Sequence, residues 1–385
     1  MTGKLFPFIL PVIGFLLAAC AASPTPAPLL MLAQTPQMIE AFPTVAPSDT
    51  PGVPPAVMQP TPSPPVTPAP SFPSTYRVTD GGCCNGPFWS SDNQKVLYLD
   101  RPSPDAMAGI WGIDRGGGSP MLITDRMGVF SADLSLRAFP AQGQTVVERL
   151  ADGSRWIIPN GGRAVSFSRD GTQLVWTSGQ SGPPFDSAQR QIWISNFDGS
   201  NPRKIHELLS GSVIGWYPDG RLLVSGRLSA PESGQAIWAL TPPTQETETT
   251  QVKELARGQR LRAASLSPDG AWLAYVVTFS DDPAQDGLWL LNTNNLERRK
   301  LELFGSYRWR DGSRLLIVPL DLSQSASHRL WQMNAVSGQI TPLTDPEHTP
   351  FKIANGDWSV SPDGSSIAYV SAQDQNIWVI NLPSP

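Results

Sequence analysis

Histidine, lysine and cysteine are scarce in this chain. Its 385 residues include 3 His, 6 Lys and 3 Cys, only 16% are charged, and the net charge is -5. So little positive charge excludes the broad basic surface with which proteins bind nucleic acid. Few imidazoles and thiols also leave little material for a metal centre or a catalytic histidine. We therefore expect no nucleic-acid partner, no metal and no cofactor.

Proline, in contrast, is abundant. The chain contains 40 Pro, roughly twice the usual share of about 5%. Each proline inside a helix costs about 3 kcal/mol, so a mostly helical protein is excluded.

The first twenty residues read MTGKLFPFILPVIGFLLAAC. Lys4 precedes an apolar run, Leu5–Ala19, that is shorter than the roughly 20 residues of a membrane-spanning helix and fits a secretory signal. The run ends in Leu17-Ala18-Ala19-Cys20, which resembles the lipobox of bacterial lipoproteins; an ordinary signal peptide with a chance cysteine is the alternative.

The lipobox resemblance implies a location in the cell. Residues 1–19 would be a removable lipoprotein signal peptide, and Cys20 would carry the lipid that holds the protein to a membrane. We expect an extracytoplasmic, lipid-anchored protein of the cell envelope. It would lie in the outer membrane of a two-membrane organism and otherwise on the outer face of the plasma membrane.

Residues 20–75 are predicted to be the lipidated cysteine followed by a disordered tether. Sixteen of the 55 residues from 21 to 75 are Pro, none is Trp or Tyr, and the charged residues are Glu40 and Asp49. Such a segment buries too little apolar area to offset the entropy of ordering, and its proline runs favour an extended spacer.

One phrase recurs seven times after residue 76: an apolar strand, a turn related to Ser-Pro-Asp-Gly, and a second apolar strand. The turn aspartates are Asp92, Asp133, Asp170, Asp219, Asp269, Asp311 and Asp363, at intervals of 37 to 52 residues. Aspartate and glycine favour such hairpin turns, so we interpret these aspartates as structural rather than as catalytic or calcium-binding groups. A strand with tryptophan follows in every repeat except the second, which has TVVERL, and a short fourth strand ends every unit except the last.

Repeats of 40–50 residues with four strands predict an all-β protein, a seven-bladed β-propeller over residues 76–385. Six or eight blades stay open because the second repeat is atypical. The last repeat lacks its fourth strand. We expect Tyr76–Asp80 to supply it and so to close the ring.

The W/F-S-P-D-G…I-A-Y…I-W repeat, as in Trp358–Trp378, resembles the TolB-like family of β-propellers. The resemblance implies that the strand before SPDG is innermost and that the protein is an interaction module or a gate. No G-x-S-x-G nucleophile motif accompanies it.

That strand order gives the propeller two faces. The SPDG turns lie on one, here called the turn face. The other, the loop face, carries the long loops Arg101–Ala108, Ser178–Arg190, Ser280–Gly287, Asp321–His328 and Asp345–Gly356. Long loops on a rigid scaffold favour a binding site at the loop-face mouth of the central channel.

Two local features are ambiguous. His206, His328 and His348 fall near the loop face, but their offsets within their repeats differ, which favours lone surface histidines over a metal site. Cys83 and Cys84 could form a strained vicinal disulfide or remain two thiols, because adjacent Cα atoms lie about 3.8 Å apart, below the usual disulfide range.

The sequence thus predicts a lipid-tethered, non-catalytic propeller that binds a protein or an envelope polymer. The alternatives are a propeller enzyme (a lyase, lactonase or glycan hydrolase) with its site at the channel mouth, and a small-ligand or sugar sensor.

Overall fold

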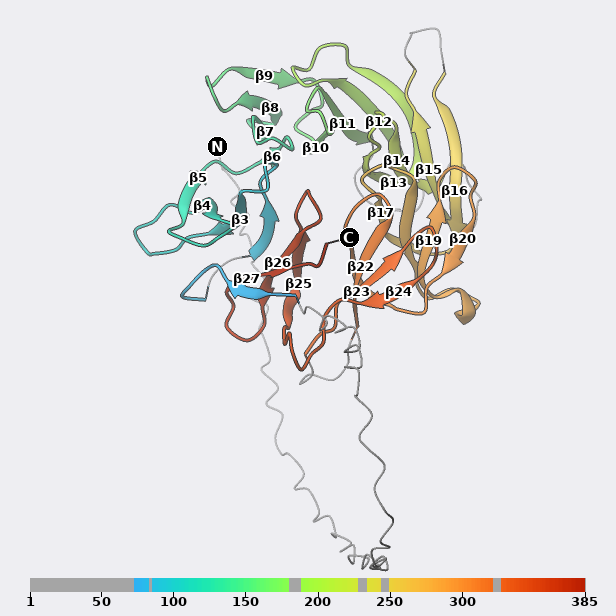
Figure 1. Cartoon of the computed structure of the whole chain (residues 1–385). Helices are drawn as coiled ribbons and strands as arrows, with labels where there is room; N and C mark the ends of the chain where they lie inside the picture. The colour runs from blue at the N-terminus through green and yellow to red at the C-terminus, as the bar shows by residue number, and fades with distance from the viewer. Residues whose placement is uncertain are drawn as a thin grey trace, which may run out of the picture. The chain divides into compact units, whose positions relative to one another are not determined.

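The computed structural model describes residues 73–82, 85–179, 188–227, 234–243, 249–320 and 327–384. Within these residues the regular structure is β-strand apart from one 3-10 turn, η1 (Pro283–Gln285). The strands form six antiparallel sheets around a central axis (Figure 1). The predicted all-β class is confirmed.

Four of the sheets are four-stranded blades whose strands follow chain order from the centre outward. The first contains β2 (Asn85–Trp89), β3 (Lys95–Asp100), β4 (Gly109–Asp114) and β5 (Met121–Thr124); the second contains β6 (Val129–Phe130), β7 (Leu136–Ala141), β8 (Gln144–Arg149) and β9 (Arg155–Ile158). Another contains β17 (Leu261–Leu266), β18 (Trp272–Val277), β19 (Gly287–Asn292) and β20 (Arg298–Lys300), and the next β21 (Gly305–Trp309), β22 (Arg314–Pro319), β23 (Trp331–Asn334) and β24 (Ile340–Pro342).

The closing blade joins the two ends of the propeller. It contains β25 (Ile353–Val360), β26 (Ser366–Ser371) and β27 (Ile377–Asn381), and its fourth strand is β1 (Thr75–Arg77). Tyr76 pairs with Val379 in an antiparallel register. The prediction that an N-terminal strand completes the last repeat is confirmed.

The sixth sheet has seven strands. They are β10 (Val165–Phe167), β11 (Gln173–Gly179), β12 (Gln189–Asn196), β13 (Arg203–Trp216), β14 (Leu222–Arg227), β15 (Gln235–Thr241) and β16 (Gln251–Gly258). The third and fourth repeats, expected as two separate blades, share this one sheet, so the described structure has five blades and one larger sheet.

The long strand β13 joins the two repeats. It pairs with β12 up to Leu209 and with β14 from Leu209 onward, with an irregularity in register between Leu209 and Gly211. Gly211 has a φ of 99°, which favours glycine, and a β-carbon there would collide with the backbone oxygen of Ser225. Glycine therefore lets the strand bulge at this point without ending.

Among the described residues, apolar side chains of the central strands pack the blades against their predecessors at every junction except that between the first and second blades. In the first blade the cross-strand pair Val96 and Ile113 contacts the closing blade. Leu273 and Leu291 hold the equivalent position in the β17–β20 blade and pack toward β13–β16. Burial of such pairs is the main source of stability between blades.

Candidate functional site

The turn aspartates form the hairpins of the turn face. Asp170 accepts hydrogen bonds from the hydroxyl of Ser168 (2.6 Å) and the backbone N–H of Thr172 (3.1 Å). The backbone N–H two residues on also donates to Asp92, Asp133, Asp219, Asp269, Asp311 and Asp363, at 2.8–3.1 Å. These bonds hold the chain in its turn. The pKa of Asp92, Asp133 and Asp170 is lowered first by the hydrogen bond from the serine hydroxyl two residues earlier and then by the backbone bond.

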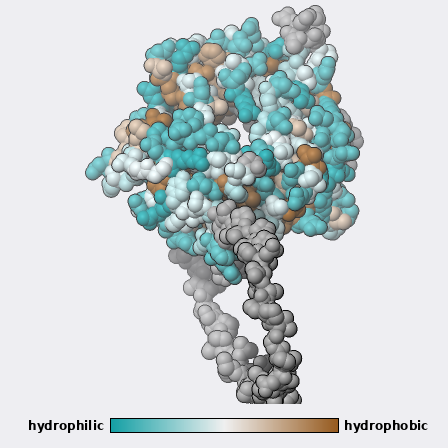
Figure 2. All heavy atoms as spheres, viewed as in Figure 1, coloured by the Kyte–Doolittle hydropathy of each residue, from teal (hydrophilic) through white to brown (hydrophobic). Residues whose placement is uncertain are grey.

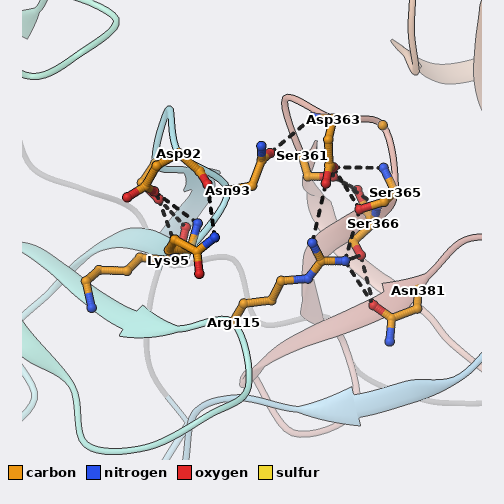
Figure 3. A network of polar contacts seen from close by, with 12 residues as sticks. Asp92, Asn93, Lys95, Arg115, Ser361, Asp363, Ser365, Ser366 and Asn381 are labelled. Carbon is orange, nitrogen blue, oxygen red and sulfur yellow. Dashed lines mark hydrogen bonds and ion pairs between the residues drawn. The ribbon is translucent and has the colours of Figure 1, made fainter.

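Arg115 links the first blade to the closing blade on the turn face (Figure 3). Its guanidinium donates to the hydroxyls of Ser365 and Ser366 and lies 3.6 Å from the carboxylate of Asp363. Burial alone would raise the pKa of Asp363, but bonds from Ser361 and Ser365 and the charge of Arg115 outweigh it, so the pKa falls to about 2. The network fastens the ends of the ring together.

The three histidines occupy separate elements. His206 lies in β13, and burial lowers its pKa. Nδ1 of His328 accepts a hydrogen bond from the backbone N–H of Ile353, and Nδ1 of His348 lies 3.1 Å from Oδ2 of Asp345. Across the described residues, no group of three His, Cys, Asp or Glu side chains is placed to hold a metal ion.

The three cysteines lie outside the described residues. Lipidation of Cys20 and a disulfide between Cys83 and Cys84 therefore stay predictions. No helix in the described part of the chain is long and apolar enough to cross a membrane.

The junction between the first and second blades, here called the seam, differs from the other junctions. Where the first blade has Val96 paired with Ile113, the second has Arg137 paired with Glu148. Nη2 of Arg137 lies 2.6 Å from Oε2 of Glu148, and both side chains are buried. Among the described residues, no apolar cluster joins the two blades, whereas one lies across each other junction, including the boundary within the seven-stranded sheet.

Glu148 is the centre of a charged cluster at the seam. Besides Arg137 it contacts Arg126 at 3.0 Å and Arg155 at 2.9 Å, while its own side chain is 1% exposed. Burial alone would raise the pKa of Glu148, but hydrogen bonds from Arg155 and Arg137 and the arginine charges reverse the effect and lower the pKa. One carboxylate therefore forms ion pairs with three guanidinium groups.

Apolar side chains are exposed beside this cluster. They belong to β5, to the chain that crosses to the second blade and to the first residue of β6, and we call them the β5 surface: Met121, Leu122, Ile123, Met127 and Val129. Met121 and Met127 are 51% and 54% exposed. Figure 2 shows hydrophobic atoms at the molecular surface in the region of β5. Several exposed apolar groups close together along the chain are typical of interaction surfaces.

A pocket at the loop face continues the β5 surface. It measures about 250 Å³ and is lined by Gly128, Val129, Ala138, Phe139, Pro140, Thr145, Gly162, Arg163, Ala164 and Val165. Val129 and Val165 begin the innermost strands β6 and β10, so the pocket lies beside the loop-face end of the channel. The repeat motif itself predicts neither the pocket nor the seam. The visible difference in the sequence is TVVERL, whose charged residues stand where the other repeats have a strand with tryptophan.

Comparison with known proteins supports the fold. No protein-family model matches the chain, and no curated protein matches it. The structure is similar to an oligogalacturonate lyase from Vibrio parahaemolyticus, with a TM-score of 0.53, 12% identity, and coverage of 82% of this chain and 98% of that one.

Two further similarities concern a prolyl endopeptidase and the β-propeller domain of Cps50 (Swd1) from Myceliophteria thermophila. Their TM-scores are 0.50 and 0.48 at 11% identity, with 78% and 81% of this chain covered. This chain spans 51% of the endopeptidase and 100% of the Swd1 domain. At such identities the similarities to the lyase and the endopeptidase establish the β-propeller fold alone.

Proposed function

We propose that this protein is a membrane-anchored, extracytoplasmic lipoprotein of the TolB-like kind. Its propeller would act as a non-catalytic binding module for a protein or polymer of the cell envelope. The Leu17–Cys20 motif and the proline-rich tether support the anchor. The observation that carries the binding role is the exposed β5 surface, which continues into the loop-face pocket.

The proposal includes a ring of seven structural units. Within the seven-stranded sheet, β13 would serve twice, as the outermost strand beside β12 and as the innermost strand beside β14. Counted in this way, the sheet supplies two units of four strands, in agreement with the seven turn motifs. The ring would then present a rigid scaffold from which the loop face binds its partner.

The anchor is tested on the full chain in bacterial cells fed a radiolabelled fatty acid. We expect the wild type to be labelled and to sediment with membranes, and the Cys20→Ala variant to lose both properties. Cys83→Ala is the matched control and should keep both. Membrane association that survives in Cys20→Ala would contradict the lipid anchor.

The binding role is tested with a photo-crosslinking amino acid placed in the exported full chain. We expect a discrete crosslinked species from position Met127 on the β5 surface. Val336 is 69% exposed and lies on the β23–β24 connection, so it serves as the control position and should give none. Equal crosslinking at both positions, or none at Met127, would count against a specific binding surface there.

A further inference from the structure

The outermost strand of the first blade, β5, lacks the charged residues and the proline that protect the other sheet edges. The outermost strands β1, β9 and β20 each contain arginine, and β24 ends in Pro342. Strand β5 has the sequence MLIT, with neither charge nor proline. Exposed, uncharged, apolar edges are templates for pairing with another strand, and native proteins block them unless they are used.

Both faces of β5 offer apolar contacts beside that edge. A β-carbon at Gly112 would meet the side chains of Leu97 and Ile123, so Ile123 lies on the face turned toward the second blade. Leu122 pairs with Trp111 and lies on the opposite face. A strand added to β5 would therefore find an apolar neighbour for its side chains on either face.

The charge next to this edge favours an acidic partner. Arg126 follows β5 by two residues, and its side chain is 48% exposed; that of Arg155 is 62% exposed. Both share Glu148 with Arg137, so three arginines face that one carboxylate. A second copy of this chain would bring further arginines to the site, whereas an acidic segment would supply the missing negative charge.

We propose that β5 binds an extended peptide segment of a partner protein, in which apolar side chains alternate with aspartate or glutamate, by strand addition. The inference rests on the proposed binding role and specifies its site and partner class. Backbone hydrogen bonds to the outer edge of β5 would hold the segment. Because side chains alternate between the two faces of a strand, its apolar side chains would lie on the face of Leu122, and its carboxylates would lie on the opposite face and approach Arg126 and Arg155.

The test measures fluorescence anisotropy of labelled octapeptides with the full chain purified in detergent. We expect the alternating Val/Asp peptide to bind at least ten-fold more tightly than the Val/Lys peptide. A Val/Asp peptide with alternate N-methylated amides, which cannot complete a strand ladder, should lose binding. Equal affinity for the acidic and basic peptides, or undiminished binding of the N-methylated peptide, would overturn the inference.

Protein variants locate the site. The double variant Arg126→Glu/Arg155→Glu should reverse the preference between the two peptides, and Leu122→Asp, on the face that would meet the apolar side chains, should weaken binding of the Val/Asp peptide at least ten-fold. Arg257→Glu, on the distant strand β16, is the matched control and should leave binding unchanged. Circular dichroism and thermal melting establish that each variant is folded; a folded double variant with unaltered preference would overturn the inference.

The remaining outcomes separate this inference from the proposed function. If neither peptide binds but Met127 still gives a specific crosslink, the strand-addition inference fails and the binding role stands. If both experiments are negative, both proposals fail. A dimer detected by light scattering and abolished by Leu122→Asp would also overturn the inference, because a second copy would then occupy β5.

Discussion

Replacing Glu148 with alanine is expected to lower the free energy of unfolding by about 3–5 kcal/mol, the usual loss when one partner of a buried ion pair is removed. The carboxylate is 1% exposed and the side chain of its partner Arg137 is 9% exposed. Without Glu148, the guanidinium of Arg137 would remain buried without its counter-charge. The stacking of Arg137 over Phe139, at 4.0 Å from the ring centroid, offsets only a small part of that loss.

The exposed arginines of the same cluster set the scale for comparison. The side chain of Arg155 is 62% exposed although it lies 2.9 Å from Glu148. Exposed ion pairs contribute about 0–1 kcal/mol. Arg155→Ala should therefore lower the free energy of unfolding by no more than about 1 kcal/mol, and the difference between the two variants isolates the buried pair.

The assay is urea denaturation at pH 7, followed by tryptophan fluorescence. Because the pKa of Glu148 is lowered in the folded protein, its ionised form stabilises the fold above the unfolded-state pKa, and this contribution is lost as the pH falls. The gap between wild type and Glu148→Ala should shrink between pH 5 and pH 3. If Glu148→Ala and Arg155→Ala had the same free energy of unfolding, the assignment of a buried, stabilising pair at the seam would be refuted.

Three further perturbations test the fold by the same denaturation assay. Arg115→Ala, which removes the link to Ser365, Ser366 and Asp363, should lose about 1–3 kcal/mol of unfolding free energy; an equal effect of Arg257→Ala, in an exposed pair, would contradict a closing role. Gly211→Ala should lose at least about 1–3 kcal/mol through its positive φ and its collision with Ser225, while Gly116→Ala, in open space, should change little. For Asp363, whose pKa of about 2 lies below the usual aspartate value of about 3.9, the stability advantage of wild type over Asp363→Asn should be full above about pH 4 and disappear as the pH falls to about 2; a pH-independent difference would contradict the ionised hydrogen-bonded state.

The repeated turns made most of the fold predictable from sequence. Asp and Gly at a fixed place in a hairpin act through local bonds, so each motif specifies its own turn without knowledge of the rest of the chain. The need for a fourth strand in the last repeat was likewise visible as a missing element, and β1 supplies it. The junction at β13 was not predictable, because Ser210-Gly211 is compatible with a turn and only the pairing with β14 makes it a bulge.

The candidate site was less visible because it depends on cross-strand register. Arg137 and Glu148 are eleven residues apart, and nothing local indicates that they face each other across β7 and β8. Their signal lies in comparison between repeats: Glu148 stands where the other blades have Ile113, Leu291 or Ile380. A charge at a position that is uncharged in the other repeats, and apolar in all of them but the third, which has Ser195, points to a junction with a different task.

The seam is expected to stabilise the fold and to position Arg126 and Arg155. These two roles can be separated by giving the second blade the paired residues of the first. In an Arg137→Val/Glu148→Ile variant, the apolar pair would face Leu97 and Ile110 of the first blade, which are already buried there. Replacing a buried ion pair by apolar residues of suitable volume is often neutral or stabilising by about 1–4 kcal/mol. We therefore expect a variant at least as stable as wild type in urea, with weaker preference for the Val/Asp peptide because Arg126 and Arg155 lose their organising carboxylate. A strongly destabilised double variant would mean that the charged pair fits the seam better than an apolar one. Full stability with undiminished acidic-peptide preference would mean that Glu148 does not position the exposed arginines.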